Sequence, residues 1–189
     1  MCHPTDKRKA ERANDSEPRK AKTPKLILLK KLPPVTTDNT NGLVKKFREE
    51  ITLTASSTWS GWPPENATDD NIKSSWFSGK NDAAAKGTTP WLQVNFPRDV
   101  VVKRVTILGN RDPEWLIGFT ILKGSVTLYD QAGKVLKHEQ NKGTGNFRDF
   151  DFQFEEPVGS VRGVRFTSLA DQGDQTEFGD IAIAQIQVE

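Results

Sequence analysis

The sequence predicts an all-β domain, a sandwich of about eight antiparallel strands preceded by a disordered basic N-terminal tail. Three observations lead to this fold class. Apolar and polar residues alternate with a period of two through most of the chain after residue 51, turn-forming residues separate these runs, and no long helical pattern interrupts them. With 189 residues, the chain has room for one ordinary domain and a tail.

The first 41 residues differ in composition from the rest. Residues 1–31 contain ten Lys or Arg and four Asp or Glu, whereas the remaining residues contain 17 basic and 21 acidic side chains. Apart from the segment LILLKKLPPV, residues 1–41 have too few apolar side chains to offset the entropy of ordering. We expect a disordered basic tail and linker, suited to nucleic acid, an anionic surface or an import receptor, or simply a solvated leader.

The domain is expected to span residues 42–189. Residues 43–50 (LVKKFREE) fit either a short helix or an entering strand. Residues 51–57 alternate, and residues 91–96 (WLQVNF) place Leu, Val and Phe on one face and Trp, Gln and Asn on the other. Residues 100–108 (VVVKRVTIL) form a dense β-branched run. The last two segments are expected to be core strands.

The second half of the chain continues the strand pattern. Residues 125–129 and 134–140 flank the turn sequence DQAG and predict a hairpin. Residues 147–154 (FRDFDFQF) alternate Phe with polar partners, and residues 161–167 (VRGVRFT) are similar. Residues 181–188 (IAIAQIQV) close the chain. After a small shift in register, the residues of this strand expected to face the core are Ile181, Ile183, Ile186 and Val188.

The loop-forming stretch after the first strand contains four of the five tryptophans. Trp59 and Trp62 lie among Ser, Gly and Pro, where turns are expected and side chains stay near solvent. Aromatic residues outside a regular apolar stripe favour recognition over core packing. We therefore expect Trp59 and Trp62 to face a ligand.

The sequence offers little for catalysis. The single cysteine is Cys2, and the two histidines are His3 and His138. The pattern around His138 predicts a solvent-facing strand residue. The chain therefore has too few of these residues for a His-based triad or a Cys-based metal site. Asp69 and Asp70 are adjacent in a turn and have no fixed separation for a glycosidase pair. We expect a protein that is not an enzyme.

Seven short motifs follow one another along the chain: ASS (55–57), NATD (66–69), SSW (74–76), PWLQV (90–94), VTI (105–107) followed by Arg111, VRGVRF (161–166) and IAIAQIQV (181–188). Their order and spacing resemble the discoidin or coagulation factor V/VIII type C family, which includes the family 32 carbohydrate-binding modules. The resemblance covers residues 51–189 and implies a galactose-binding-like jelly roll whose loops bind a ligand at one end. It also implies that Trp76 and Trp91 pack in the core.

The resemblance implies a sugar site formed by three converging loops. Trp62 and Trp59 come from the first loop, Arg111 from the loop after the strand at 100–108, and Phe178 from the turn before the last strand. A pyranose packs its C–H face on an aromatic ring while its hydroxyls bond to charged groups. Family members often carry a polar residue where Trp62 falls, which leaves the identity of the sugar open. Further candidates are Asn81, Asp112, Trp115 and Glu177.

Several of these residues have a structural alternative. Arg111 could brace its loop by an ion pair with Asp112 or Glu114. Phe178 fits either a ligand platform or a lid on the core. Trp115 fits either packing within its loop or contact with the ligand.

The resemblance further implies a structural Ca²⁺, since Ca²⁺ takes six to eight oxygen ligands. Two departures bear on it: Asp70 stands where the family often has Gly, and the last strand carries Gln where the family has Glu. The alternative is an Asx-rich turn whose side chains cap their own backbone. The candidate ligands are Ala67, Asp69, Asn71, Ser74 and Gln185.

These observations predict a non-catalytic carbohydrate-binding module, a monomeric domain whose partner is a glycan or glycoprotein. One alternative is an intracellular protein-interaction or scaffold domain whose basic tail contacts nucleic acid or a partner. Another is binding to a membrane surface through Trp59 and Trp62 at the loop tips. The resemblance favours an extracellular location, yet the sequence shows no convincing export signal and no apolar run near the roughly 18 residues of a membrane span.

Overall fold

The computed structural model describes residues 42–189, and the predicted tail at 1–41 lies outside them. The segment that fitted either a helix or a strand begins as a helix of one turn. No helix in the described part of the chain is long and apolar enough to cross a bilayer. The elements in chain order are α1 (Leu43–Lys46), β1 (Thr52–Ala55), η1 (Pro64–Ala67), β2 (Trp76–Phe77), η2 (Ala84–Lys86), β3 (Trp91–Gly109), β4 (Ile121–Tyr129), β5 (Val135–Lys142), β6 (Phe150–Asp171), η3 (Gly173–Gln175) and β7 (Ala182–Val188).

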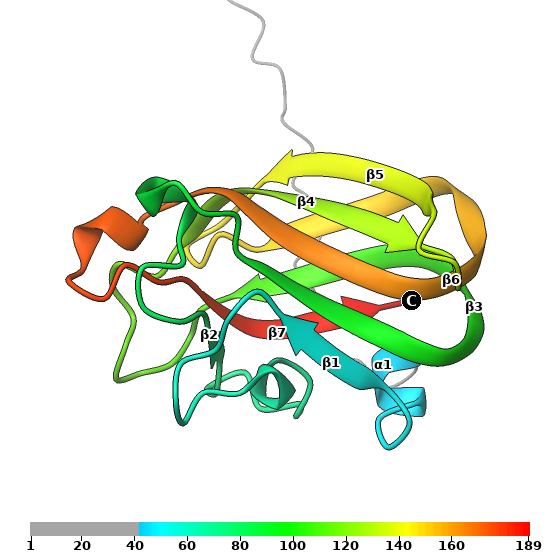
Figure 1. Cartoon of the computed structure of the whole chain (residues 1–189), viewed down its shortest axis with the longest axis horizontal. Helices are drawn as coiled ribbons and strands as arrows, with labels where there is room; N and C mark the ends of the chain where they lie inside the picture. Colours follow the sequence, from blue (N-terminus) through cyan, green and yellow to red (C-terminus); the bar gives the residue numbers. More distant parts are fainter. Residues whose placement is uncertain (1–41) are drawn as a thin grey trace, which may run out of the picture. The chain divides into compact units, whose positions relative to one another are not determined.

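The strands form two packed layers because β3 and β6 each run from one layer into the other (Figure 1). The first layer consists of β1, the first part of β3, the last part of β6, β4 and β5. The second consists of β2, β7, the last part of β3 and the first part of β6. All these pairings are antiparallel, and the predicted antiparallel β-sandwich is confirmed.

The core lies between the two layers. Phe150 of the second layer packs against Phe166 of the first, with ring centroids 5.0 Å apart. The alternating apolar residues of β3 and β7 are buried in the same core, as the period-two pattern predicted. Each fully buried side chain of this size contributes about 1.5–3 kcal/mol relative to an exposed one. The inward-facing residues of the last strand are those expected: Ile181, Ile183, Ile186 and Val188.

The number of strands differs from the prediction. Residues 91–96 and 100–108 were expected to be separate strands, but they belong to one strand, β3. The two segments at 147–154 and 161–167 likewise lie largely within β6. Register shifts between Asn95 and Arg104 bend β3 from one layer to the other without ending it. The structure therefore has seven strands within residues 42–189. The hairpin expected from the DQAG turn is confirmed by the pairing of β4 with β5.

The prediction that Trp76 and Trp91 both pack in the core is right for Trp76 and wrong for Trp91. Trp76 is fully buried, and its indole nitrogen donates to the carbonyl of Ser57. Trp91 is half-exposed on the outer face of the first layer. There the guanidinium of Arg165 lies 4.0 Å from the ring centroid, in a cation–π contact. The neighbour of Trp91, Leu92, takes the inward position instead.

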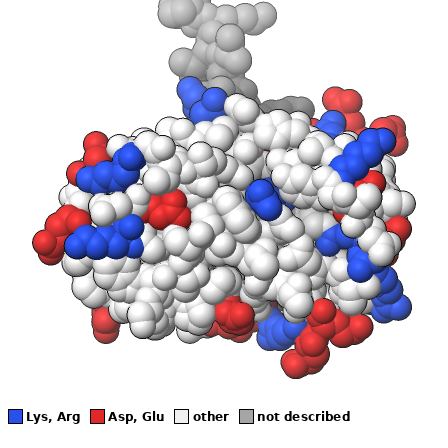
Figure 2. Space-filling view, in the orientation of Figure 1, with Lys and Arg blue, Asp and Glu red and all other residues white. Residues whose placement is uncertain are grey.

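The strand register gathers several loops at one end of the sandwich, at the left of Figure 1. Gly109 at the end of β3 pairs with Ile183 near the start of β7, and Phe77 of β2 pairs with Ala182 beside it. Ile121 at the start of β4 pairs with Asp171 at the end of β6. The loops that precede or follow these strands therefore lie together. Over the face shown in Figure 2, acidic and basic side chains are interspersed.

Candidate functional site

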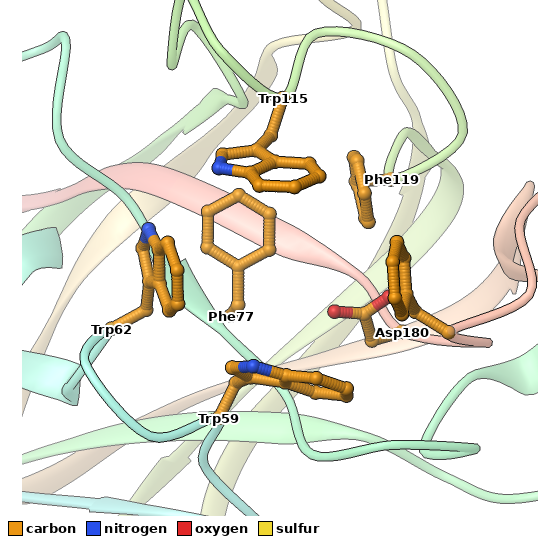
Figure 3. Close-up of a pocket in the computed structure, with 7 residues that line it drawn as sticks. Trp59, Trp62, Phe77, Trp115, Phe119 and Asp180 are labelled. Carbon is orange, nitrogen blue, oxygen red and sulfur yellow. The ribbon is translucent and has the colours of Figure 1, made fainter.

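Six aromatic rings meet at this end of the sandwich (Figure 3). They come from the loop after β1, from β2, from the loop between β3 and β4, and from the loop before β7. These segments are far apart in the sequence and are brought together by the pairing of β2, β3 and β7. The rings, called the aromatic cage below, are Trp59, Trp62, Phe77, Trp115, Phe119 and Phe178.

The rings of the aromatic cage stand edge to face. Trp115 is nearly perpendicular to Trp62 and to Phe178, at 88° and 86°, with centroids 6.3 and 6.0 Å apart. Trp59 meets Phe178 at 76° and 5.6 Å. This arrangement is favourable for aromatic quadrupoles, and it makes the rings the walls of a cavity of about 70 Å³.

A carboxylate lines the same cavity. Asp180 is 3% exposed, and its Oδ1 is buried without a hydrogen-bond partner within residues 42–189. Burial raises the pKa of Asp180 to about 6, because the charged form loses its hydration. Figure 3 shows the carboxylate pointing into the space between the rings. A buried acid with a raised pKa in an apolar cavity is typical of a functional site.

Two glycines allow the loops to present these side chains. Gly118, which precedes Phe119, has φ +92°, and a Cβ there would collide with the side chain of Thr176. Gly179 has φ +66° and separates Phe178 from Asp180. Only glycine adopts this backbone region without strain, so both turns depend on the absence of a side chain.

A second buried aspartate fixes the loops behind the cage. Asp171, at the end of β6, accepts hydrogen bonds from the amides of Ala84 (2.7 Å), Ala85 (3.1 Å) and Gly173 (3.2 Å) and from the hydroxyl of Ser168 (2.7 Å). One carboxylate thus connects η2, β6 and η3. Its bonds hold the loop that continues to Phe178 and Asp180.

The structure brings four of the predicted ligand-facing residues together. Trp59, Trp62, Trp115 and Phe178 all belong to the aromatic cage, although each also packs against neighbouring rings. Of these, Trp115 is the most exposed, at 37%. Their role in ligand binding stays a prediction.

Sequence reasoning did not single out Phe77, Phe119 or Asp180. Phe77 directly follows the buried Trp76, and the two-residue strand β2 buries both. Phe119 and Asp180 each follow a glycine with positive φ at the entrance to a strand. A Gly-Phe and a Gly-Asp pair just before a strand were the available signals.

Arg111 is not part of the aromatic cage. Its guanidinium forms an ion pair with Asp149 (Nη2 to Oδ2, 2.6 Å), donates to the carbonyl of Gly109 (2.7 Å) and lies 4.5 Å from the centroid of Phe147. A bracing role was one of the alternatives for Arg111, but the expected partners were Asp112 and Glu114. The side chain of Asp112 instead accepts from the amide of Glu114, within the loop.

Asn81 and Glu177 lie close to the cage without lining its cavity. Asn81 has φ +62°, and its amide donates to the carbonyl of Phe178 at 2.9 Å, so it supports the loop through the backbone. Glu177 is exposed beside Phe178. Both are placed to contact a ligand only outside the cavity.

The candidate calcium ligands form a network of their own. Asp69 accepts from the amide of Asn71 (2.8 Å) and the hydroxyl of Ser74 (2.6 Å). This is the Asx-rich turn that was the alternative to calcium. Asp70 lies 2.5 Å from the guanidinium of Arg48, so a cationic side chain already faces this carboxylate.

The remaining candidate ligands are Gln185 and Ala67. Gln185 donates to Asp70 at 3.3 Å, where a Glu would have offered a negative oxygen, and Ala67 is buried. Within residues 42–189, no group of three or more His, Cys, Asp or Glu is arranged to hold a metal ion. Ca²⁺ also takes backbone carbonyl and side-chain amide oxygens, so a structural Ca²⁺ at these residues stays a prediction.

Two antiparallel layers with a pocket formed by loops at one end define a galactose-binding-like β-sandwich. A family model described as F5/8 type C domain matches residues 52–182, which is more than half of the chain. The chain belongs to the F5/8 type C domain family. No curated protein matches it with significant similarity.

Solved structures share this fold at low sequence identity. The family 32 CBM from C. perfringens NanJ, in complex with galactose, is 21% identical, with a TM-score of 0.58 over 75% of this chain and 94% of that one. A Streptococcus pneumoniae fucose binding module is 18% identical, with a TM-score of 0.55 over 72% and 89%. An F5/8 type C domain from Bacteroides fragilis is 13% identical, with a TM-score of 0.57 over 75% and 91%.

Proposed function

We propose that this domain is a non-catalytic carbohydrate-binding module that recognises a glycan at the aromatic cage. The observation that carries the proposal is the convergence of Trp59, Trp62, Trp115 and Phe178 from three separate loops at one end of the sandwich. The fold is that of modules whose solved complexes contain galactose or Lewis b antigen. This likeness supports a sugar ligand without naming the sugar.

The size of the cavity limits how a sugar binds. A cavity of roughly 150 Å³ has room for a benzene ring, whereas the volume within the cage is about 70 Å³. A pyranose therefore rests at the mouth, against the more exposed Trp115, and one of its substituents enters the cavity. Much of the sugar stays solvated, so we expect dissociation constants between roughly micromolar and millimolar, about −8 to −4 kcal/mol.

Replacing Trp62 by Ala is expected to weaken glycan binding by about tenfold or more, because it removes one wall of the cage. The measurement is a glycan array with the full chain, with and without calcium, followed by titration of the best ligand. Trp91→Ala is the matched control, since Trp91 is also a half-buried tryptophan but lies on the outer sheet face. It should bind like the wild type.

Equal binding by the wild type and Trp62→Ala would move the sugar site away from the cage. A blank array from folded protein in both calcium conditions would argue against glycan binding and favour docking to a protein. Binding that needs calcium would support the predicted Ca²⁺ site, at which Asp69, Asp70 and Gln185 would exchange their present contacts for the ion.

A second candidate function is binding to a membrane surface. Its specific support is the tip of the loop between β3 and β4, where Trp115, Leu116 and Ile117 are 37%, 49% and 83% exposed. Three consecutive exposed apolar residues at a loop tip are suited to insertion among lipid headgroups. The sequence had suggested that Trp59 and Trp62 contact the membrane, but both pack into the cage.

If the loop tip inserts, Ile117→Asp reduces co-sedimentation with liposomes by about tenfold, because a charge replaces the most exposed apolar side chain. Ile117 is 83% exposed, so folding should be unaffected. Absence of co-sedimentation by the wild type would eliminate this candidate.

A further inference from the structure

The aromatic cage has the geometry of a cation site. Its rings stand nearly perpendicular to one another and surround a small cavity on several sides. The face of an aromatic ring carries negative charge and attracts a cation within about 6 Å of its centroid. Aromatic cages of several rings are a known means of recognising quaternary ammonium groups, and six rings line this cavity.

The carboxylate of Asp180 adds a full negative charge to this cavity. It is almost completely buried, its Oδ1 has no hydrogen-bond partner, and no charged neighbour within residues 42–189 compensates it. Buried charges in proteins are usually paired, because an isolated one is costly. A cation would supply the missing partner of Asp180, and the carboxylate points toward the space among the rings (Figure 3).

The surrounding loops have the charge that a cationic ligand requires. Residues 110–119 and 172–180 together carry five acidic residues and one basic residue. The basic residue is Arg111, whose charge is already paired with Asp149. The loop at 56–63 is uncharged. A negative field at the mouth of a cleft concentrates cations there.

The cavity also restricts the kind of cation. A volume of about 70 Å³ admits a group of a few heavy atoms. Within it, Oδ1 of Asp180 is the one buried acceptor without a partner. A primary ammonium would bring three N–H donors and leave most of them unpaired, whereas a dimethylated ammonium brings one and a trimethylated ammonium none. Its methyl groups can pack against the rings.

We propose that the aromatic cage binds a methylated ammonium group at its mouth, with methyl groups entering the cavity against the rings and Asp180 as the counter-ion. The inference rests on the proposed function in that the same pocket binds the ligand, and it names the group that enters the cavity. A choline ester on a glycan and a choline headgroup on a lipid share this chemistry.

The test uses choline and its neutral isostere 3,3-dimethylbutan-1-ol, titrated into the full chain. Three tryptophans line the cavity, so their fluorescence reports binding. We expect choline to bind about tenfold or more tightly than the isostere, and Asp180→Asn to remove most of this difference. Trp59→Ala should weaken both ligands, because it removes a wall of the cage. Trp91→Ala should bind both as the wild type does.

Equal binding of choline and the isostere, or no binding of either, would overturn the inference. Phosphatidylcholine vesicles form a separate arm: sedimentation with them, competed by free choline, identifies a lipid source, and its absence with choline binding intact identifies a soluble or glycan-borne group. If neutral glycans bind on the array while choline does not, the cation inference fails and the proposed function stands. If choline binds while the array is blank, the cation inference stands and the proposed glycan binding fails.

Discussion

Replacing Asp171 by Ala is expected to lower the free energy of unfolding by about 4 kcal/mol. The carboxylate accepts four hydrogen bonds, three of them from backbone amides of η2 and η3. The substitution leaves the donors of Gly173 and Ser168 buried without a partner and that of Ala84 partly buried, and each unpaired buried group costs about 1–3 kcal/mol. Urea denaturation of the purified full chain measures the change.

Asp174→Ala is the control for this prediction. Asp174 lies three residues away in η3 and is exposed, so its removal should change stability by less than about 0.5 kcal/mol. Asp171→Asn should fall between the two, because the amide keeps one acceptor oxygen. Similar stability of Asp171→Ala and Asp174→Ala would show that the bonds to Ala84, Ala85 and Gly173 contribute little.

Replacing Asp180 by Asn has the opposite expected effect, an increase in stability of about 2 kcal/mol at pH 7.5. The pKa of Asp180 is about 6 in the folded chain and 3.8 as its ordinary value, and each pKa unit corresponds to about 1.4 kcal/mol. Between these values the folded state binds more protons than the unfolded state. The contribution of Asp180 to stability therefore falls as the pH rises from about 4 to 6, and the full cost remains above that range.

The pH dependence separates this effect from simple repacking. At pH 4 a protonated Asp180 resembles Asn, so the wild type and Asp180→Asn should differ little, and the gap should open as the pH approaches 7. Guanidinium or urea unfolding of the wild type and of Asp180→Asn measures the difference in unfolding free energy at each pH. A variant less stable than the wild type at pH 7.5 would mean that Asp180 has a stabilising partner in the native protein.

The buried carboxylates of Asp171 and Asp180 differ in their hydrogen bonding. Asp171 has every donor it can use, whereas Asp180, nine residues later, has a buried oxygen with none. A protein gains nothing in stability from the second arrangement. Its place beside six aromatic rings is the observation on which the proposed cation site rests.

The fold could be predicted largely from strand periodicity. Alternation identified the core faces of β3 and β7 and the hairpin of β4 and β5. It could not show that β3 and β6 continue through their bends, because the polar residues and Pro97 there resemble a loop. Trp91 was misplaced because its strand buries Leu92 on the other face, and Arg165 covers the outward ring.

The site was predicted in part. Trp59 and Trp62 stood out because apolar aromatics are unusual in a turn, and the resemblance added Phe178. Phe77 and Asp180 could not be found this way, since each looks like an ordinary residue next to a strand. Their importance arises from contacts between segments about 100 residues apart, such as the pairing of Phe77 with Ala182. The ion pair of Arg111 with Asp149 has the same origin.

The passage of β3 and β6 through both layers also determines how the chain must fold. Trp76 pairs with Ile183 and Val105 with Val188, so the second layer cannot close until the last residues have arrived. Pairings this distant carry a large loop-closure entropy, and domains dominated by them fold in roughly milliseconds to seconds. Neither layer can form ahead of the other, because each contains half of the same two strands. The aromatic cage is therefore expected to appear in the final cooperative step of folding, and not in an earlier partly folded species.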